Sequence, residues 1–216
     1  MYKNVFFDLD GTLTDSAEGI TNSVEYALNR LGITGYERSE LYKFIGPPLM
    51  DSFEEFFGLS EEKCMEGVRL YREYFSEKGI YENKLYGGVK ELLEKTRRSG
   101  RTVALATSKP REFAEEILRY FDIAKYFDHI AAAEMNGKRN RKEDVINYAL
   151  EISGAKREET VMVGDRKFDI LGAKSAEIAS IGVLYGFGSE AELVEAGADH
   201  IAKTPEEIFE IIVCSD

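Results

Sequence analysis

The chain has 216 residues, of which 31% are charged and 44% apolar, and its formal net charge is −12. This length and composition allow one globular core domain with a smaller insert, and they exclude a disordered chain. The negative charge argues against nucleic acid and against an anionic membrane surface as partners, because both would repel an acidic protein.

The first predicted element is a strand that ends in two acids. Asn4 and the apolar residues 5–7 lead into Asp8-Leu9-Asp10-Gly11. Side chains alternate along a strand, so Asp8 and Asp10 point the same way at its carboxyl end, where ligands of open α/β sheets bind. The two carboxylates repel each other, and a divalent cation such as magnesium would relieve this repulsion. An acidic turn without a ligand is the alternative explanation of the same stretch.

Residues 16–86 are predicted to form an all-helical insert. Apolar residues recur at helical spacing from Ile20 to Leu31, and Gly32 is expected just past the end of that helix. The following helices, separated by glycine and proline, are expected over residues 41–45, 49–57 and 61–78, with Met65 facing inward in the last of them.

The turn Gly46-Pro47-Pro48 separates two of these helices. Gly46 and Pro47 are candidates for a loop of the insert that contacts the substrate. A plain connection between two helices explains the turn equally well.

From residue 87 onward, predicted strands and helices alternate. Strands are expected over residues 102–107, 129–133, 161–163 and 178–184, and helices over residues 88–99, 110–120, 141–153 and 169–175, with terminal helices beginning near Ser189 and Thr204. Pro110 is expected as the first residue of its helix. Such alternation predicts a parallel sheet covered on both faces. The fold class is therefore α/β, with a Rossmann-like core of residues 1–15 and 87–216 and a small helical domain of residues 16–86 inserted after the first strand.

Three further stretches follow predicted strands at the same edge of the sheet. Thr107-Ser108-Lys109 offers a hydroxyl group and a nearby helix N-terminus, both suited to a phosphoryl oxygen. The basic loop over residues 137–142 interrupts an otherwise acidic chain. The last stretch places Asp165 and Asp169 four residues apart after a buried strand.

In this combination and order, the chain resembles the haloacid dehalogenase superfamily of phosphatases, in its phosphoglycolate-phosphatase-like branch. The residues that carry the resemblance to the four family motifs are 8–16, 107–109, a lysine near 142, and 164–169. The helical insert is similar to the small cap domain of that family. The resemblance implies a phosphoric monoester hydrolase that acts on a small phosphorylated metabolite.

The resemblance also implies roles for the candidate residues. Asp8 would attack phosphorus and become an aspartyl phosphate. Asp10 would protonate the leaving alcohol and later accept a proton from the attacking water. Thr107, the backbone at Ser108 and Lys142 would hold the transferring oxygens.

A magnesium ion, Mg2+, is implied as the cofactor. It would lie between Asp8, the backbone carbonyl of Asp10 and Asp165. Asp169 would orient the surroundings of the metal without binding it.

The third motif departs from the family pattern, which commonly has Lys-Pro there. No proline follows any lysine of the loop. We prefer Lys142 as the motif lysine because it starts a predicted helix, whereas Lys138 lies in a glycine-flanked turn.

The substrate is left open among phosphoglycolate, a nucleoside monophosphate (as for a 5'-nucleotidase) and pyrophosphate. Asp10 argues against a dehalogenase, because a leaving halide needs no proton. A sugar phosphomutase uses the same pair of acids, but the insert offers no histidine. A phospho-receiver signalling domain also has an acidic cluster, yet it is much shorter and lacks a helical insert.

The remaining expectations concern the surroundings of the protein. The amino terminus shows no signal-peptide pattern, and no stretch has transmembrane length. Cys64 and Cys214 are far apart and are expected to be free thiols in a reducing compartment. We therefore expect a cytoplasmic protein, monomeric or weakly dimeric, with no nucleic-acid or membrane partner.

Overall fold

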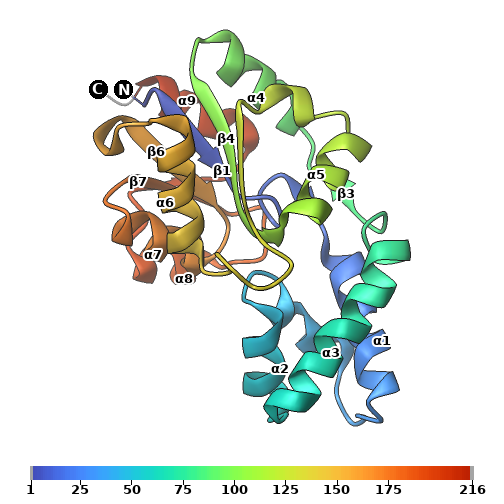
Figure 1. Cartoon of the computed structure of the whole chain (residues 1–216). Coiled ribbons are helices and arrows are strands. Elements are labelled where there is room, and N and C mark those ends of the chain that lie inside the picture. The colour runs from blue at the N-terminus through green and yellow to red at the C-terminus, as the bar shows by residue number, and fades with distance from the viewer. Residues whose placement is uncertain (1, 215–216) are drawn as a thin grey trace. The chain divides into compact units, whose positions relative to one another are not determined.

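A six-stranded parallel sheet forms the centre of the unit that carries the candidate catalytic residues, as the computed structural model shows (Figure 1). The model describes residues 2–214. The strands are arranged in the order β5, β4, β1, β6, β7, β8. Their bounds are β1 (Asn4–Phe7), β4 (Thr102–Pro110), β5 (His129–Ala133), β6 (Thr160–Gly164), β7 (Ala179–Val183) and β8 (His200–Ala202). The predicted α/β class with a parallel sheet is confirmed.

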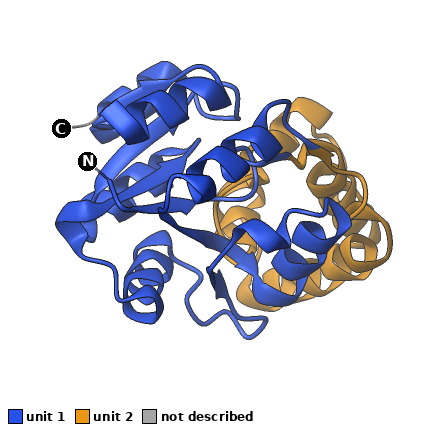
Figure 2. Cartoon of the chain, turned by 90° about the horizontal axis from the view of Figure 1, so that it is seen from above, with its two compact units in different colours: residues 1–14, 85–216 blue, residues 15–84 orange. Residues whose placement is uncertain are grey.

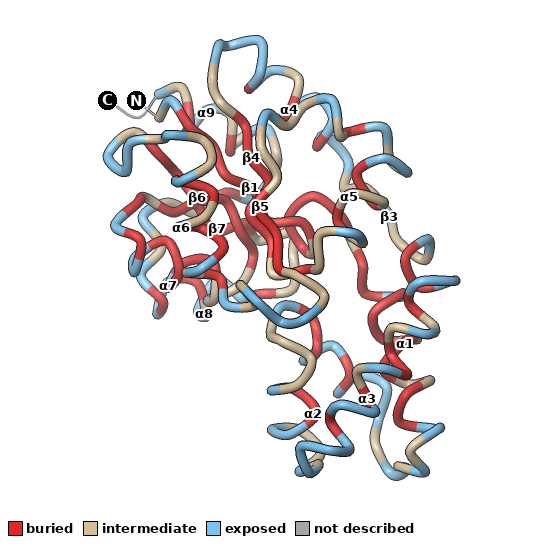
Figure 3. The backbone as a smooth tube through the Cα atoms, in the orientation of Figure 1, coloured by how far each residue is buried: buried red, intermediate tan, exposed pale blue. Residues whose placement is uncertain are grey.

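Helices cover both faces of this sheet. On one face α6 (Lys142–Ser153) packs against α7 (Lys167–Ser175), and on the other α4 (Val89–Arg98) packs against α9 (Pro205–Cys214). The remaining helices of this unit are α5 (Arg111–Tyr120), α8 (Glu190–Ala196) and the short turns η3 (Ala124–Tyr126) and η4 (Arg157–Glu159). Figure 3 shows that the central strands are buried, which fits their nearly uncharged sequences.

The described chain divides into two compact units, which Figure 2 colours separately. The first unit consists of the residues up to Thr14 and those from Leu85 onward, and the second unit consists of Asp15–Lys84. The chain passes between the units at β2 (Thr14–Asp15) and β3 (Lys84–Leu85). The second unit is otherwise helical, with α1 (Ala17–Arg30), η1 (Arg38–Phe44), α2 (Leu49–Phe57), α3 (Glu61–Tyr74) and η2 (Phe75–Gly79).

The inward face of α3 was predicted incorrectly at one position. Met65 is 55% exposed, whereas Gly67 and Leu70 are buried. A Cβ atom at Gly67 would lie 3.1 Å from the Phe53 ring, so α3 contacts α2 through a residue without a side chain. A pattern based on apolar side chains treats glycine as a break, and the expected face was therefore rotated toward Met65.

The start of α5 also differs from the prediction. Strand β4 continues to Pro110, and the helix begins at Arg111, so Pro110 precedes the helix instead of being its first residue. The pairing of β4 with β5 changes register between Thr107 and Pro110. This irregularity, which the sequence did not reveal, lies within the second motif.

No helix within residues 2–214 is both long and apolar enough to cross a membrane. Cys64 and Cys214 are free thiols, the first buried and the second exposed. This agrees with the expectation for the two cysteines.

Two glycines of the second unit give opposite expectations for the same substitution. A Cβ at Gly19 would lie 1.9 Å from the backbone oxygen of Gly79, which cannot move away easily, whereas the Cβ at Gly67 would meet only the Phe53 ring. We expect Gly19→Ala to lower the free energy of unfolding by about 1–3 kcal/mol. Gly67→Ala should be close to neutral, because alanine favours a helix by about 1 kcal/mol over glycine and offsets a small ring shift. Urea unfolding followed by circular dichroism measures both, and equal stability of the two variants would contradict this packing.

Candidate functional site

Asp8 and Asp10 directly follow β1 at its carboxyl end. The Asp8 N–H donates to Val163 O at 2.9 Å, which continues the pairing of β1 with β6 by one residue. The Leu9 carbonyl then accepts the Leu13 N–H at 2.9 Å and closes a tight turn. The acids therefore leave the sheet from a rigid strand end.

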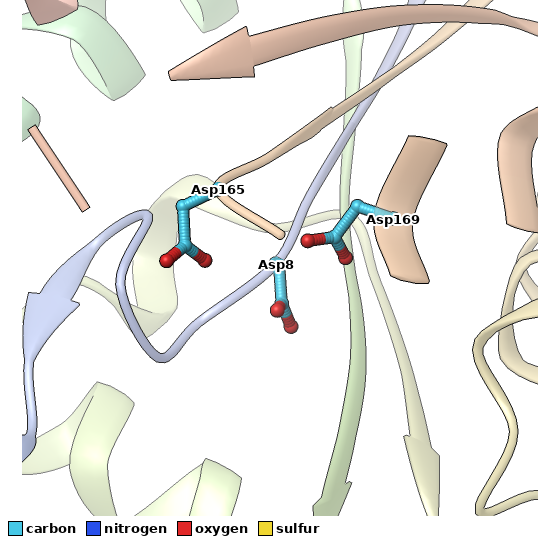
Figure 4. A group of neighbouring side chains, drawn as sticks. All are labelled: Asp8, Asp165 and Asp169. Atoms are coloured by element: carbon cyan, nitrogen blue, oxygen red, sulfur yellow. The ribbon is translucent and has the colours of Figure 1, made fainter. Parts of the chain in front are cut away.

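Three buried carboxylates converge beyond the ends of β1 and β6. Figure 4 shows Asp8, Asp165 and Asp169 directed into a common space. One oxygen of each lies within 4.8 Å of those of the others, which makes them the group among residues 2–214 that could hold a metal ion. Asp165 directly follows β6, and Asp169 lies in the first turn of α7.

Lys142 supplies the positive charge within this cluster. It is the first residue of α6 and is buried. Its Nζ lies 2.7 Å from Asp8 Oδ1 and 2.8 Å from Asp169 Oδ1, and it donates to the Ala106 carbonyl at 3.2 Å. Lys138, the other candidate for the motif lysine, is exposed.

The cluster carries more negative than positive charge. Burial raises the pKa of Asp8 to about 6. The neighbouring Lys142 lowers this pKa, but by less than burial and the charge of Asp169 together raise it. Burial also raises the pKa of Asp165 well above its usual range, and Asp169 adds to this effect. Burial disfavours the Lys142 ammonium, but Asp169 and Asp8 together raise its pKa, so it stays charged. The unbalanced charge favours a bound cation.

Unpaired oxygens support the same conclusion. Asp10 Oδ1 is buried and accepts no hydrogen bond. Asp8 Oδ1 and Asp169 Oδ1 lie within ion-pair distance of Lys142 Nζ but outside hydrogen-bonding geometry. Buried carboxylate oxygens without full pairing are costly, and a hard divalent cation binds such oxygens. The incompletely paired oxygen of Asp8, which lies close to Asp165, therefore fits a magnesium site, whereas the free oxygen of Asp10 is available for proton transfer.

Glycines allow the acids to approach the backbone. A Cβ at Gly11, whose φ is +80°, would lie 2.1 Å from Asp165 Oδ2, and a Cβ at Gly164 would lie 2.1 Å from Asp169 Cγ. Any side chain at either position would displace a carboxylate of the cluster.

The loop between β7 and α8 completes the surroundings of Asp165. The Phe187 N–H donates to Asp165 Oδ2 at 2.7 Å, and a Cβ at Gly186 would lie 2.3 Å from Asp165 Cβ. Tyr185 donates its hydroxyl to the Thr12 carbonyl at 2.9 Å. Sequence reasoning missed this loop, although its glycines follow a buried strand at the same sheet edge and were a usable signal.

The second motif lies on β4, next to β1. Thr107 is buried, and its Oγ1 accepts the Lys109 N–H at 3.2 Å. Ser108 is half-buried. Lys109, which received no role in the sequence analysis, is buried and its Nζ lies 2.8 Å from Asp10 Oδ2.

Gly46 and Pro47 belong to the second unit, where they connect η1 to α2. Gly46 is exposed with φ of +110°, and Pro47 is half-buried. Their contact with a substrate stays a prediction.

Comparison with known proteins adds a family to this geometry. Residues 5–183 match the family described as haloacid dehalogenase-like hydrolase. A 5'-nucleotidase from Pseudomonas aeruginosa is 48% identical over 192 residues, covering 89% of this chain and 87% of that protein. Tyrosine-protein kinase PtkA from Mycobacterium tuberculosis is 40% identical over 200 residues, covering 93% of this chain but 65% of that protein. The crystal structure of a predicted phosphatase from Clostridium acetobutylicum has a TM-score of 0.95 at 46% identity, with 99% of both chains covered. Phosphoglycolate phosphatases and pyrophosphatase PpaX are among the further relatives.

The raised pKa of Asp8 predicts how stability depends on pH without metal. The folded-state pKa of about 6 exceeds the ordinary value of 3.8, so the protonated acid stabilises the fold at low pH, and this contribution is lost as pH rises through about 6. We expect chelator-treated protein to melt at a lower temperature near pH 7.5 than near pH 5. Asp8→Asn should reduce this difference, whereas Glu62→Gln, at an exposed position, should leave it unchanged. Thermal melts in chelator test this, and the same pH difference in Asp8→Asn as in the wild type would contradict it.

Proposed function

The chain belongs to the haloacid dehalogenase-like hydrolases, and from this membership we propose that it is a magnesium-dependent phosphatase that hydrolyses a small phosphate monoester through an aspartyl phosphate on Asp8. Membership confirms the resemblance found in the motifs, and the chain is a phosphoric monoester hydrolase, like the 5'-nucleotidase and the phosphoglycolate phosphatases among its relatives. The intermediate, the metal and the substrate are the proposed parts.

The observation that carries the proposal is the position of Asp8. Its carboxylate lies at the carboxyl edge of a parallel sheet, in ion-pair contact with Lys142 and near Asp165 and Asp169. A fixed lysine beside a carboxylate can hold a phosphoryl oxygen while the carboxylate attacks phosphorus.

The reaction would proceed in two displacements. In the first, an Asp8 oxygen bonds to phosphorus, the ester P–O bond breaks, and the leaving oxygen takes a proton from Asp10. In the second, water attacks the same phosphorus and gives its proton to Asp10, and the bond from phosphorus to Asp8 breaks. Inorganic phosphate and the alcohol are released, and both acids return to their starting states.

Other residues of the first unit would bind the transferring group. We assign the phosphoryl oxygens to Thr107, the backbone at Ser108 and Lys142. Thr107 and Ser108 lie on β4, which pairs with β1, and Lys142 reaches the Ala106 carbonyl of the same strand. Positioned donors of this kind stabilise the charge of phosphoryl transfer.

The residues that would hold Mg2+ are Asp8, Asp165 and the backbone carbonyl of Asp10. The ion would neutralise charge on the transferring group and on the acids. Asp169 is better suited to a supporting role, because its oxygens already face Lys142 Nζ and the Arg166 N–H.

A nucleoside 5'-monophosphate is the first substrate to test. This choice rests on the 5'-nucleotidase relative, which is more similar to the chain than the phosphoglycolate phosphatases are. A panel of nucleoside monophosphates, phosphoglycolate and pyrophosphate, assayed for phosphate release with Mg2+, ranks the candidates. Hydrolysis of none of the monoesters would overturn the proposal.

Asp8→Asn should abolish the reaction. An amide is a poor nucleophile and a weak metal ligand, so we expect kcat to fall by at least about 10³-fold. Acid-quenched wild-type protein should contain a phosphorylated peptide with Asp8, and the variant should not, as mass spectrometry can show. Asp51→Asn, at an exposed position of the second unit, is the matched control. Substantial residual activity in folded Asp8→Asn protein would rule out the nucleophile.

The second unit should influence which ester is hydrolysed. The family resemblance assigns this unit a cap role, and Gly46 with Pro47 are the candidate contact loop. We expect Gly46→Ala to change the ranking of natural esters by kcat/KM while leaving p-nitrophenyl phosphate less affected, because the reacting groups all lie in the first unit. If every substrate lost activity by one factor, the loop would have a structural role only.

A further inference from the structure

The ion pair between Lys109 and Asp10 is not explained by the roles assigned so far. Lys109 Nζ lies 2.8 Å from Asp10 Oδ2, and the two side chains are only 6% and 15% exposed. Burying a lysine and a carboxylate is unfavourable, and their mutual attraction only partly offsets the cost of removing both charges from water. The position of this pair next to the reacting groups suggests a function beyond packing.

The shape of β4 directs Lys109 toward Asp10. Thr107 and Lys109 are both buried on this strand, although Ser108 between them is only half-buried. The Lys109 N–H bonds to Thr107 Oγ1, and the register shift against β5 lies between Thr107 and Pro110. The backbone that carries Lys109 is therefore fixed by the same residue that is assigned to the phosphoryl group.

The two oxygens of Asp10 have different surroundings. Oδ2 accepts from the Lys109 ammonium, whereas Oδ1 is buried and has no hydrogen-bond partner. An ammonium only donates hydrogen bonds, so the oxygen it contacts must keep a lone pair toward it. When Asp10 is a neutral acid, its proton therefore belongs on Oδ1, and Oδ2 is the carbonyl oxygen.

We propose that Lys109 is a positioning residue that holds Asp10 Oδ2 and leaves Oδ1 as the atom that gives and takes the proton. This inference rests on the proposed function, in which Asp10 is the general acid and base. In the first displacement, the proton moves from Oδ1 to the leaving oxygen as its bond to phosphorus breaks. In the second, a proton of the attacking water returns to Oδ1, while Lys109 stays bound to Oδ2 throughout.

The test compares two esters of nearly the same size. Phenyl phosphate releases phenolate, a much stronger base than the p-nitrophenolate released from p-nitrophenyl phosphate, so only the former depends strongly on a positioned acid. The measured quantity is the ratio of kcat/KM for p-nitrophenyl phosphate to that for phenyl phosphate. The variants are Lys109→Met, which keeps length without a donor, Lys109→Arg, which keeps the donor, and Asp10→Asn, with Lys174→Met at an exposed position as control.

We expect Lys109→Met to raise the ratio by about 10- to 100-fold, which is part of the effect of a whole general acid. Asp10→Asn should raise it at least as much, Lys109→Arg should restore part of the loss, and Lys174→Met should leave it at the wild-type value. Circular dichroism establishes that each variant is folded, and Lys109→Leu, which also lacks a donor, replaces Lys109→Met if the latter does not fold. A merely structural lysine would lower both activities by one factor and leave the ratio unchanged.

The outcomes separate the inference from the proposed function. If Asp10→Asn raises the ratio and neither Lys109→Met nor Lys109→Leu does, the positioning role of Lys109 is wrong while the assignment of Asp10 stands. If Asp10→Asn itself leaves the ratio unchanged, the acid–base role of Asp10 fails, and the inference fails with it.

Discussion

The structure of the site depends on the contact of one ammonium with two buried carboxylates. Lys142 lies between Asp8 and Asp169 because it is the first residue of α6, and that helix is fixed on the sheet by Val145 and Ile146. Removing one partner of such a buried pair costs about 3–5 kcal/mol, far more than a surface pair is worth. The packing of an apolar helix face thus determines where the charge of this buried lysine lies.

Glycine residues, which have no side chain, provide the space for the acids. Gly11 and Gly164 bring two main-chain segments against Asp165 and Asp169, and Gly186 brings a third. Interiors are close-packed, so a single added methyl group at these places would displace a carboxylate of the cluster. The same close approach lets the Phe187 N–H donate to Asp165. The loop that buries the Asp165 carboxylate therefore also fixes its orientation.

The sequence was most informative for side chains whose position depends on a single strand. Asp8 and Asp165 could be predicted at a common edge, because both follow short buried strands of a parallel sheet. Lys109 could not be paired with Asp10, since the register shift in β4 and the turn after β1 decide that contact and neither has a local sequence signal. The strand β8, His200–Ala202, is too short to show a period, and only the short apolar stretch that follows His200 indicated it. Met65 was misplaced because glycine forms the buried contact of α3.

The position of β1 in the sheet also affects how the protein is made. β1 precedes both of its neighbours in the chain, β4 and β6, and its contact with β6 joins residues 156 positions apart. Local helices of the second unit can form during synthesis, but the strand Asn4–Phe7 has both neighbours only once β6 has been translated. A nascent chain that stalls before β6 therefore exposes a strand that is buried in the folded protein, and the adjacent Asp8 acquires Lys142 and Asp169 only after α6 and the start of α7 have been made.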